Sequence, residues 1–386
     1  MEKITCVNKS ILTWARKQAG YSHIEISNII KKDVSKWENG EDYPTYSQLK
    51  KLSDKYKKPV AIFFFPEPPK LISIRSSCRT LPSNIADSLS PVIIRLLNKA
   101  RVMQLNLYEL HEDKNPSSIK ITEFDFSDFD YENVANNIRN ILNISIDMQK
   151  KIKQYNESFE FWREQFYQIG IYVFKDAFKD SNISGFCVYD TEFPVIYINN
   201  QFSFSRQIFT LFHELYHIVT QTSGIDFIND DFLTNYSNST SLEIERRCNK
   251  FASEFLVPTN DFYSLVKSKN ISDELIGKYA KLYTVSREVI LTKLLTLGLI
   301  QNDYYKEKKE LYTEDYYRAQ KINKSRSSQF NYYNTQIAYK GQRFLENAYM
   351  SYYRNKINIS QLSSFLNMKI PSVRSLADHK GWGRVR

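Results

Sequence analysis

FTLFHELYHIV, residues 209–219, contains two histidines four residues apart and a glutamate directly after the first. In a helix, residues four apart lie on one face about one turn from each other, so His213 and His217 can direct their imidazoles at one ion. Glu214 is rotated by roughly 100 degrees around the helix, which puts its carboxylate beside the ion rather than on it. This pattern predicts a zinc-binding helix with Glu214 as the catalytic base.

The alternative is an amphipathic core helix that happens to carry two histidines. The chain has 5 His, and a chance HExxH should arise on the order of once in a hundred such sequences. The residues around the motif are mostly apolar, so polar side chains buried there need partners. A zinc ion would supply one, and it would lower the pKa of a bound water from about 15.7 toward about 7. We therefore favour Zn²⁺ as the cofactor.

A third protein ligand is needed, because catalytic zinc has three protein ligands and leaves the fourth position to water. The metzincin pattern would place glycine at position 220 and histidine at position 223, where Thr220 and Ser223 stand. That class is excluded. The ligand should then be a glutamate on a later helix, and the candidates are Glu243, Glu245 and Glu254.

Among these candidates, Glu245 shares a helical face with Cys248 and Asn249, the face that should pack inward. A carboxylate there needs a cation, either zinc or the partner in a buried salt bridge. Glu243 and Glu254 are expected to be ordinary solvated glutamates. Cys248 is a weaker candidate ligand because a cysteine can simply fill a small core position, and Asn249 is expected to hydrogen-bond a ligand or to make a helix contact.

The length of 386 residues with 42% hydrophobic residues predicts two to four globular modules. No apolar run approaches the roughly 18 residues that span a bilayer, and the N-terminus lacks a signal-peptide core, so we expect no membrane partner and a cytoplasmic location. The 4 Cys lie far apart and are expected to be reduced.

Of the net charge of +10, residues 301–386 carry about +9 and residues 1–66 about +5. Both ends are therefore candidates for contact with DNA or single-stranded nucleic acid, although charge alone favours the simpler explanation that Lys and Arg solvate helix surfaces.

The first 66 residues predict several short helices. ILTWARKQAG (11–20) ends at a glycine, Ser22 with Glu25 and Thr45 with Gln48 form capping boxes, and KWENGEDYPT (36–45) is a break. WAR, GYS, WENG and PT in this order resemble the Xre/Cro-type helix-turn-helix. Residues 27–38 are about three residues shorter than that family implies, and the loss falls on the recognition helix, so docking to a protein is an alternative to reading DNA.

The rest of the chain predicts an α+β fold that is mostly helical. Helices are expected over 85–113 and 131–168, and GIYVFK (170–175), SGFCVYD (184–190) and FPVIYINN (193–200) are typical of antiparallel strands. An exposed edge of FPVIYINN could accept a peptide by strand addition. Residues 301–386 are basic, Tyr-rich and helical, and ISQLSSFLNMKIPSVRSLADH has a weak helix-turn-helix pattern. The expected domains are 1–66, 67–150, 151–300 and 301–386.

The central residues resemble the ImmA/IrrE family of metallopeptidases. The matching stretches, in the family's order, are SCRTLP (77–82), GIYV (170–173), Gly185 with Phe186, PVIYIN (194–199), RQIFTLFHELYH (206–217) and ERRCNKFASEFLVP (245–258).

This resemblance implies a gluzincin-type domain, a small sheet over two helices, with zinc on His213, His217 and Glu245. It also implies an endopeptidase that cleaves a helix-turn-helix repressor and so releases stress, mobile-element or defence genes. Cys78 and Cys248 depart from the family, which has an aromatic residue and alanine at these positions.

Two open points remain at this stage. Tyr197 or Tyr216 could stabilise an oxyanion, although packing roles are simpler for both. The competing functions are a DNA-binding transcriptional regulator and a toxin–antitoxin component, each with a non-catalytic metal domain; an open fourth zinc position and an intact Glu214 favour the enzyme.

Overall fold

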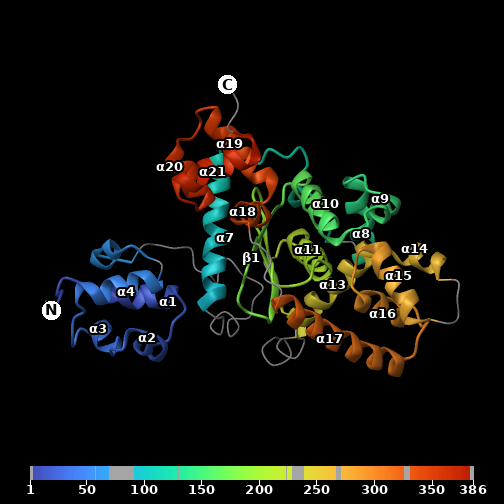
Figure 1. The fold of residues 1–386 in the computed structure, drawn as a ribbon, viewed down its shortest axis with the longest axis horizontal. Helices are drawn as coiled ribbons and strands as arrows, with labels where there is room; N and C mark the ends of the chain where they lie inside the picture. Colours follow the sequence, from blue (N-terminus) through green and yellow to red (C-terminus); the bar gives the residue numbers. More distant parts are fainter. Residues whose placement is uncertain are drawn as a thin grey trace. The chain divides into compact units, whose positions relative to one another are not determined.

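The computed structural model divides the chain into two compact units, Met1–Arg101 and Val102–Arg386, which are taken one at a time (Figure 1). The structure describes residues 3–56, 58–68, 91–127, 130–222, 224–227, 239–266, 271–325 and 331–382. The SCRTLP stretch with Cys78 and most of the 220–241 loop lie outside the described residues, as do 326–330 and the last four residues. The four expected domains stay predictions.

The first unit is helical. Its elements are α1 (Lys9–Gln18), α2 (His23–Ile30), α3 (Ser35–Asn39), α4 (Tyr46–Tyr56) and a 3-10 helix (Val60–Phe64). Both predicted capping boxes are confirmed: the Ser22 side chain accepts from the Glu25 amide, and the Thr45 amide donates to Gln48 Oε1 at 2.7 Å. Gly20 adopts φ +72° just after α1, as the predicted helix end requires.

A buried ion pair joins α1 to α3. The Arg16 guanidinium donates to both carboxylate oxygens of Glu38, at 2.8 and 3.0 Å, and to the Tyr21 carbonyl. Trp37, beside Glu38, is also buried. The WAR and WENG motifs therefore hold the core of this unit together, and α3 has only 5 residues.

The second unit contains a four-stranded mixed sheet. Its strands are β1 (Tyr172–Asp176), β2 (Ile183–Val188), β3 (Val195–Asn199) and β4 (Ile225–Phe227), in the order β1-β3-β2-β4. The small antiparallel or mixed sheet that we expect is a mixed one: β2 pairs antiparallel with β3 and β4, whereas β3 lies between β1 and β2 and runs parallel to β1. The expected free edge on FPVIYINN is wrong, because both sides of β3 are paired, and the outer strands are β1 and β4.

Helices make up most of the second unit, in agreement with the predicted mostly helical α+β class. The predicted helical run 131–168 is divided by two breaks into α8, α9 and α10. α7 (Pro91–Leu110) begins in the first unit and ends in the second. The helices after it are α8 (Tyr131–Ile141), α9 (Ile146–Lys151), α10 (Tyr155–Gln168), α11 (Phe204–Val219), α13 (Ser239–Leu256), α14 (Thr259–Leu265), α15 (Asp273–Tyr283), α16 (Arg287–Thr296), α17 (Asn302–Ser325), α18 (Tyr332–Lys340), α19 (Gln342–Tyr353), α20 (Ile359–Leu366) and α21 (Ile370–Lys380). Of the helices described, none is long and apolar enough to cross a membrane.

The two faces of the sheet have different partners. Val173, Ile196 and Cys187 belong to the apolar cluster that includes α11 and α13. Side chains alternate along a strand, so the opposite face carries Phe174 and its neighbours, and Phe174 packs edge-on against Phe344 of α19 at 5.4 Å. α18 lies beside β1 (Figure 1). The C-terminal helices thus cover one face of the sheet and the HELYH helix covers the other.

Aromatic rings fix α11 between α10 and α13. Trp162 of α10 packs edge-on against Phe212 at 4.9 Å, and Phe212 stacks on Phe255 of α13 at 4.3 Å. All three side chains are fully buried. Because Phe212 directly precedes His213, this packing sets the rotation of α11 and therefore the direction of the histidines.

Candidate metal centre

The HELYH helix is buried along almost its whole length. Ser203 caps its first turn, and His213, Glu214 and His217 have exposed fractions of 1%, 0% and 1%. On the sheet side, Gly185 of β2 allows a close approach, because a Cβ there would lie 2.4 Å from a methyl carbon of Thr210. The glycine therefore lets the sheet pack directly on α11.

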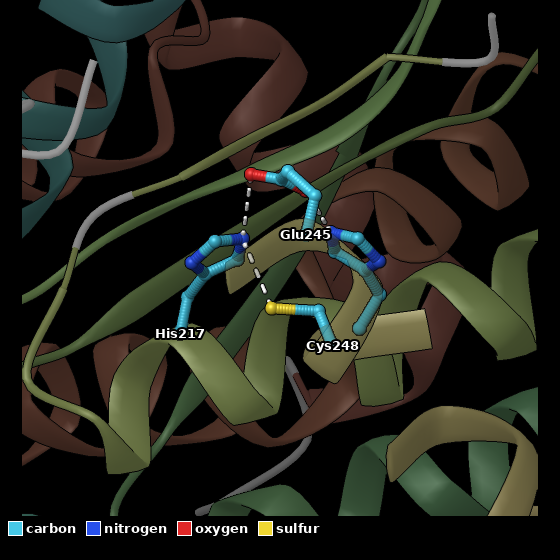
Figure 2. A group of neighbouring side chains, drawn as sticks. His217, Glu245 and Cys248 are labelled. Atoms are coloured by element: carbon cyan, nitrogen blue, oxygen red, sulfur yellow. Dashed lines mark hydrogen bonds and ion pairs between the residues drawn. The ribbon is translucent and has the colours of Figure 1, made fainter. Parts of the chain in front are cut away.

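Four side chains from α11 and α13 converge. Glu245 Oε2 lies 2.9 Å from His213 Nε2, and Glu245 Oε1 lies 3.4 Å from His217 Nε2. Cys248 Sγ is also 3.4 Å from His217 Nε2. Figure 2 shows His217, Glu245 and Cys248 pointing toward one another. One ligand atom from each of the four residues lies within 4.8 Å of the others, so the predicted residues form a single cluster.

Both imidazoles are held by their far nitrogens. His213 Nδ1 lies 3.0 Å from Asn249 Oδ1, and His217 Nδ1 lies 3.1 Å from Thr222 Oγ1. An amide oxygen can only accept, so His213 carries its proton on Nδ1. The Thr222 hydroxyl can donate to the His217 carbonyl, which leaves its oxygen to accept from Nδ1. Each Nε2 faces Glu245, and loss of the Nε2 proton would present its lone pair to a metal ion, as a metal ligand must.

The spacing of these atoms fits a zinc ion. In a tetrahedral site with bonds of about 2.0 to 2.1 Å, two ligand atoms lie about 3.3 Å apart. The nitrogen–oxygen distances of 2.9 and 3.4 Å bracket this value, and two imidazoles with a carboxylate are a typical catalytic zinc set. His213, His217 and Glu245 would hold the ion.

The Glu245 carboxyl is held in its charged form. Burial alone would raise its pKa, but the adjacent His217 charge and hydrogen bonds from both imidazoles outweigh burial and hold the pKa well below its usual range. Among the described residues, its ion pairs are with the two imidazoles. The buried salt bridge considered for Glu245 is therefore a pairing with the two histidines themselves, and no Lys or Arg ion pair is described for it.

The family comparison agrees with this geometry. Residues 167–295 match the family model described as the IrrE N-terminal-like domain. This peptidase-like segment is similar to a metallopeptidase family. It covers about a third of the chain and contains the whole four-residue cluster, the sheet and Glu214. No curated protein matches the chain.

Within the peptidase-like segment, Glu214 lies against β2. It is fully buried, and its negative charge acts on the nearby Cys187 thiol of β2. Burial first, and then the negative charge of Glu214, raise the pKa of the Cys187 thiol well above its usual value. Cys187 therefore stays a neutral thiol, which donates to the Thr222 carbonyl at 3.9 Å and accepts from the Gly224 amide at 3.4 Å.

Three contributors were not anticipated from the sequence: Thr222, Cys187 and Gly224. A Cβ at position 224 would lie 2.5 Å from His217 Nε2, so only glycine leaves that nitrogen free. The loop that carries Thr222 and Gly224 is close to His217 in sequence, but nothing in its composition indicated that it folds back onto the ring.

The other two glutamates have different partners. Glu243 is 66% exposed and pairs with Arg247 one turn later, as a solvated glutamate should. The same expectation is wrong for Glu254, whose side chain is only 12% exposed. Glu254 pairs with Lys293 and accepts from the amide and hydroxyl of Thr259. Glu254 accepts a hydrogen bond from the amide of Thr259, the first residue of α14, and its ion pair with Lys293 joins α13 to α16.

The structure does not support an oxyanion role for Tyr197. Its ring stacks on Phe186, on the sheet face opposite α11, so its hydroxyl is directed away from Glu214. Tyr216 is on α11, but its ring packs on Phe251 at 5.1 Å. It lines a cavity of about 570 Å³ with Arg247 and other residues of α13. Packing explains both tyrosines.

Proposed function

We propose that this protein is a zinc-dependent endopeptidase that cleaves a partner helix-turn-helix repressor and so relieves repression of stress, mobile-element or defence genes. The observation that carries the proposal is the convergence of His213 Nε2, His217 Nε2 and the Glu245 carboxylate beside a buried Glu214. The match of residues 167–295 to a metallopeptidase family supports the same reading.

The chain's own residues suit peptide hydrolysis. A zinc ion held by the three ligands would polarise a peptide carbonyl and acidify a water. Glu214 would accept the proton of the attacking water on a carboxylate oxygen and pass it to the leaving amide nitrogen. Its burial strengthens the proton transfer because few competing waters reach it.

The substrate is proposed to bind as an extended strand along β4. β4 is an outer strand of the sheet and pairs on one side with β2. Gly224, directly before β4, packs against the His217 ring, so a peptide added to this edge would pass close to the metal ligands. Main-chain hydrogen bonds would then give affinity with little dependence on sequence.

The first unit is proposed to resemble a helix-turn-helix in α2 and α3. α3 has 5 residues, and Trp37 and Glu38 are buried, so few of its side chains could reach base edges in a major groove. Docking of the substrate protein is therefore the better role for this unit.

Single-stranded nucleic acid is proposed as an activating signal bound by the basic C-terminal end. Residues 301–386 supply the positive charge and many tyrosines for stacking. Equal oligonucleotide affinity for the full chain and for a chain ending at residue 300 would contradict this role.

The peptidase assignment is tested with Glu214→Gln. The wild type and the variant are analysed for metal and then coexpressed with the helix-turn-helix protein encoded beside this chain. We expect about one zinc per chain in both and cleavage by the wild type alone, because the amide keeps the shape of Glu214 but cannot accept the proton. Cleavage that survives in Glu214→Gln would overturn the mechanism.

A second candidate is a DNA-binding regulator or toxin–antitoxin component with a non-catalytic metal domain. It is favoured by Cys248, because four protein ligands are typical of structural zinc. In that case the partner protein stays intact when it is coexpressed with the wild type or with Glu214→Gln, while zinc removal unfolds the peptidase-like segment.

A further inference from the structure

Cys248 lies inside the metal cluster. It follows Glu245 by three residues on α13, its side chain is fully buried, and Sγ is 3.4 Å from His217 Nε2 (Figure 2). We infer that Cys248 is a fourth protein ligand, so that in the resting protein the zinc ion is closed off by His213, His217, Glu245 and the Cys248 thiolate. This inference rests on the proposed function and adds a latent state to it.

The distances fit direct ligation. With a zinc–nitrogen bond of about 2.0 Å and a zinc–sulfur bond of about 2.3 Å, a tetrahedral site separates the two atoms by about 3.5 Å. The distance between Sγ and His217 Nε2 is 3.4 Å, which fits a sulfur and a nitrogen bound to the same ion. The competing explanation is a thiol that donates a hydrogen bond to His217 Nε2. That arrangement needs the same lone pair that a metal would occupy, so the two states are exclusive.

A closed centre has a consequence for the peptidase. The fourth position is where the attacking water and the peptide carbonyl must meet the metal, so the Cys248 thiolate has to leave before hydrolysis. Rotation about the single Cα–Cβ bond of Cys248 moves Sγ while the backbone of α13 and the Glu245 carboxylate stay in place. The chain therefore carries its own reversible inhibitor on the helix that supplies the third ligand.

The test uses the full chain loaded with Co²⁺ in place of zinc, because a cobalt–thiolate bond gives a near-ultraviolet charge-transfer band. We expect the band in the wild type, its loss in Cys248→Ala, and its retention in Cys187→Ala. Acetohydroxamate then reports the open position: it should shift the visible cobalt bands of Cys248→Ala and leave those of the wild type unchanged. Zinc affinity, measured against a chelator, should fall at least about tenfold in Cys248→Ala.

The outcomes separate this inference from the proposed function. Bound Co²⁺ without the band in the wild type overturns the thiolate ligand and leaves the His₂Glu peptidase intact. A band together with an acetohydroxamate shift in the wild type overturns the closed state. Failure of the wild type to bind Co²⁺ or zinc overturns the proposed function itself. X-ray absorption at the zinc edge of the wild type, with or without a sulfur neighbour at about 2.3 Å, decides the ligation even if Cys248→Ala does not fold.

Discussion

His217 is held from several directions at once. Thr222 Oγ1 accepts a hydrogen bond from its Nδ1, Gly224 lies against its ring, and Glu245 and Cys248 face its Nε2. Each neighbour restricts one motion of the ring. A metal ligand fixed in this way loses little entropy when an ion binds. Thr222 and Gly224 should therefore affect the affinity for zinc, although neither would touch the ion.

Gly224→Ala tests this at the residue scale. The added Cβ would lie 2.5 Å from His217 Nε2, so either the loop or the imidazole must move. We expect zinc affinity to fall by about 10- to 100-fold, measured by competition with a chelator. Gly277→Ala is the matched control, because a Cβ there meets nothing within 4 Å. If Gly224→Ala binds zinc as tightly as the wild type, the loop must move to admit the methyl group without displacing the His217 ring.

The buried Arg16–Glu38 pair tests how α1 and α3 are joined. Removing one partner of a buried pair costs about 3 to 5 kcal/mol, so Arg16→Met should strongly lower the protection of α1–α4 amides in hydrogen exchange. Lys17→Met, one residue along at an exposed position, is the control. Protection equal to that of the wild type would show that the pair contributes nothing net.

The same pair should make the first unit sensitive to acid. Burial raises the pKa of Glu38, but the hydrogen bonds and charge of Arg16 lower it by more. The net pKa of Glu38 therefore lies below its usual value of 4.5. A carboxyl with a lowered folded pKa adds stability above its unfolded pKa and loses it as the pH falls through the folded pKa. We expect amide protection in α1–α4 to drop below about pH 4.5 in the wild type, and to depend less on pH in Glu38→Gln.

At the element scale, His111 links the end of α7 to the sheet. Tyr172 of β1 and His111 Nε2 are 3.0 Å apart, and the ring stacks on Phe193. Burial, and then the positive charge of Lys356, lower the pKa of His111 to about 4. The unfolded chain, with a histidine pKa near 6.5, therefore binds more protons than the folded chain between these values.

The second unit should accordingly lose stability as the pH falls from about 6.5 to about 4, by up to about 1.4 kcal/mol per pH unit from this group. His111→Gln should flatten that slope, measured by urea unfolding at a series of pH values. His379→Gln, at an exposed position on α21, should leave it unchanged. An equal slope in the wild type and His111→Gln would contradict the assignment.

At the scale of the whole second unit, the C-terminal helices complete the sheet. Arg163 of α10 donates to the Val173 carbonyl and to the Ala338 carbonyl of α18, which ties β1 to the C-terminal helices. Phe344 of α19 is fully buried and packs against Phe174. The residues after the peptidase-like segment therefore contribute to the stability of the four-stranded sheet.

Phe344→Ala measures that dependence. Loss of a fully buried phenylalanine costs about 3 to 5 kcal/mol, and we expect the whole second unit to unfold at a correspondingly lower urea concentration. Met350→Ala on the same helix is the control, because Met350 is 47% exposed. A local loss of protection in α18–α21 with an unchanged sheet would show that the C-terminal helices fold separately from it.

Local patterns accounted for a large part of the structure. The capping boxes at Ser22 and Thr45, the mostly helical α+β class and the position of the HELYH helix follow from contacts within a few residues. The environment of Glu254 and the order of the strands could not be predicted from local patterns, because each depends on segments far apart in the chain.

The sequence alone determined that His213 and His217 share one helical face and that Glu245 lies on the inward stripe of a later helix, because helical periodicity is set by backbone hydrogen bonds four residues apart. Only the tertiary structure decided that these faces meet, that Cys248 meets them too, and that Tyr197 points to the other side of the sheet. Those relations are fixed by how α11, α13 and the strands pack, and packing depends on the shape of the whole core rather than on any short stretch.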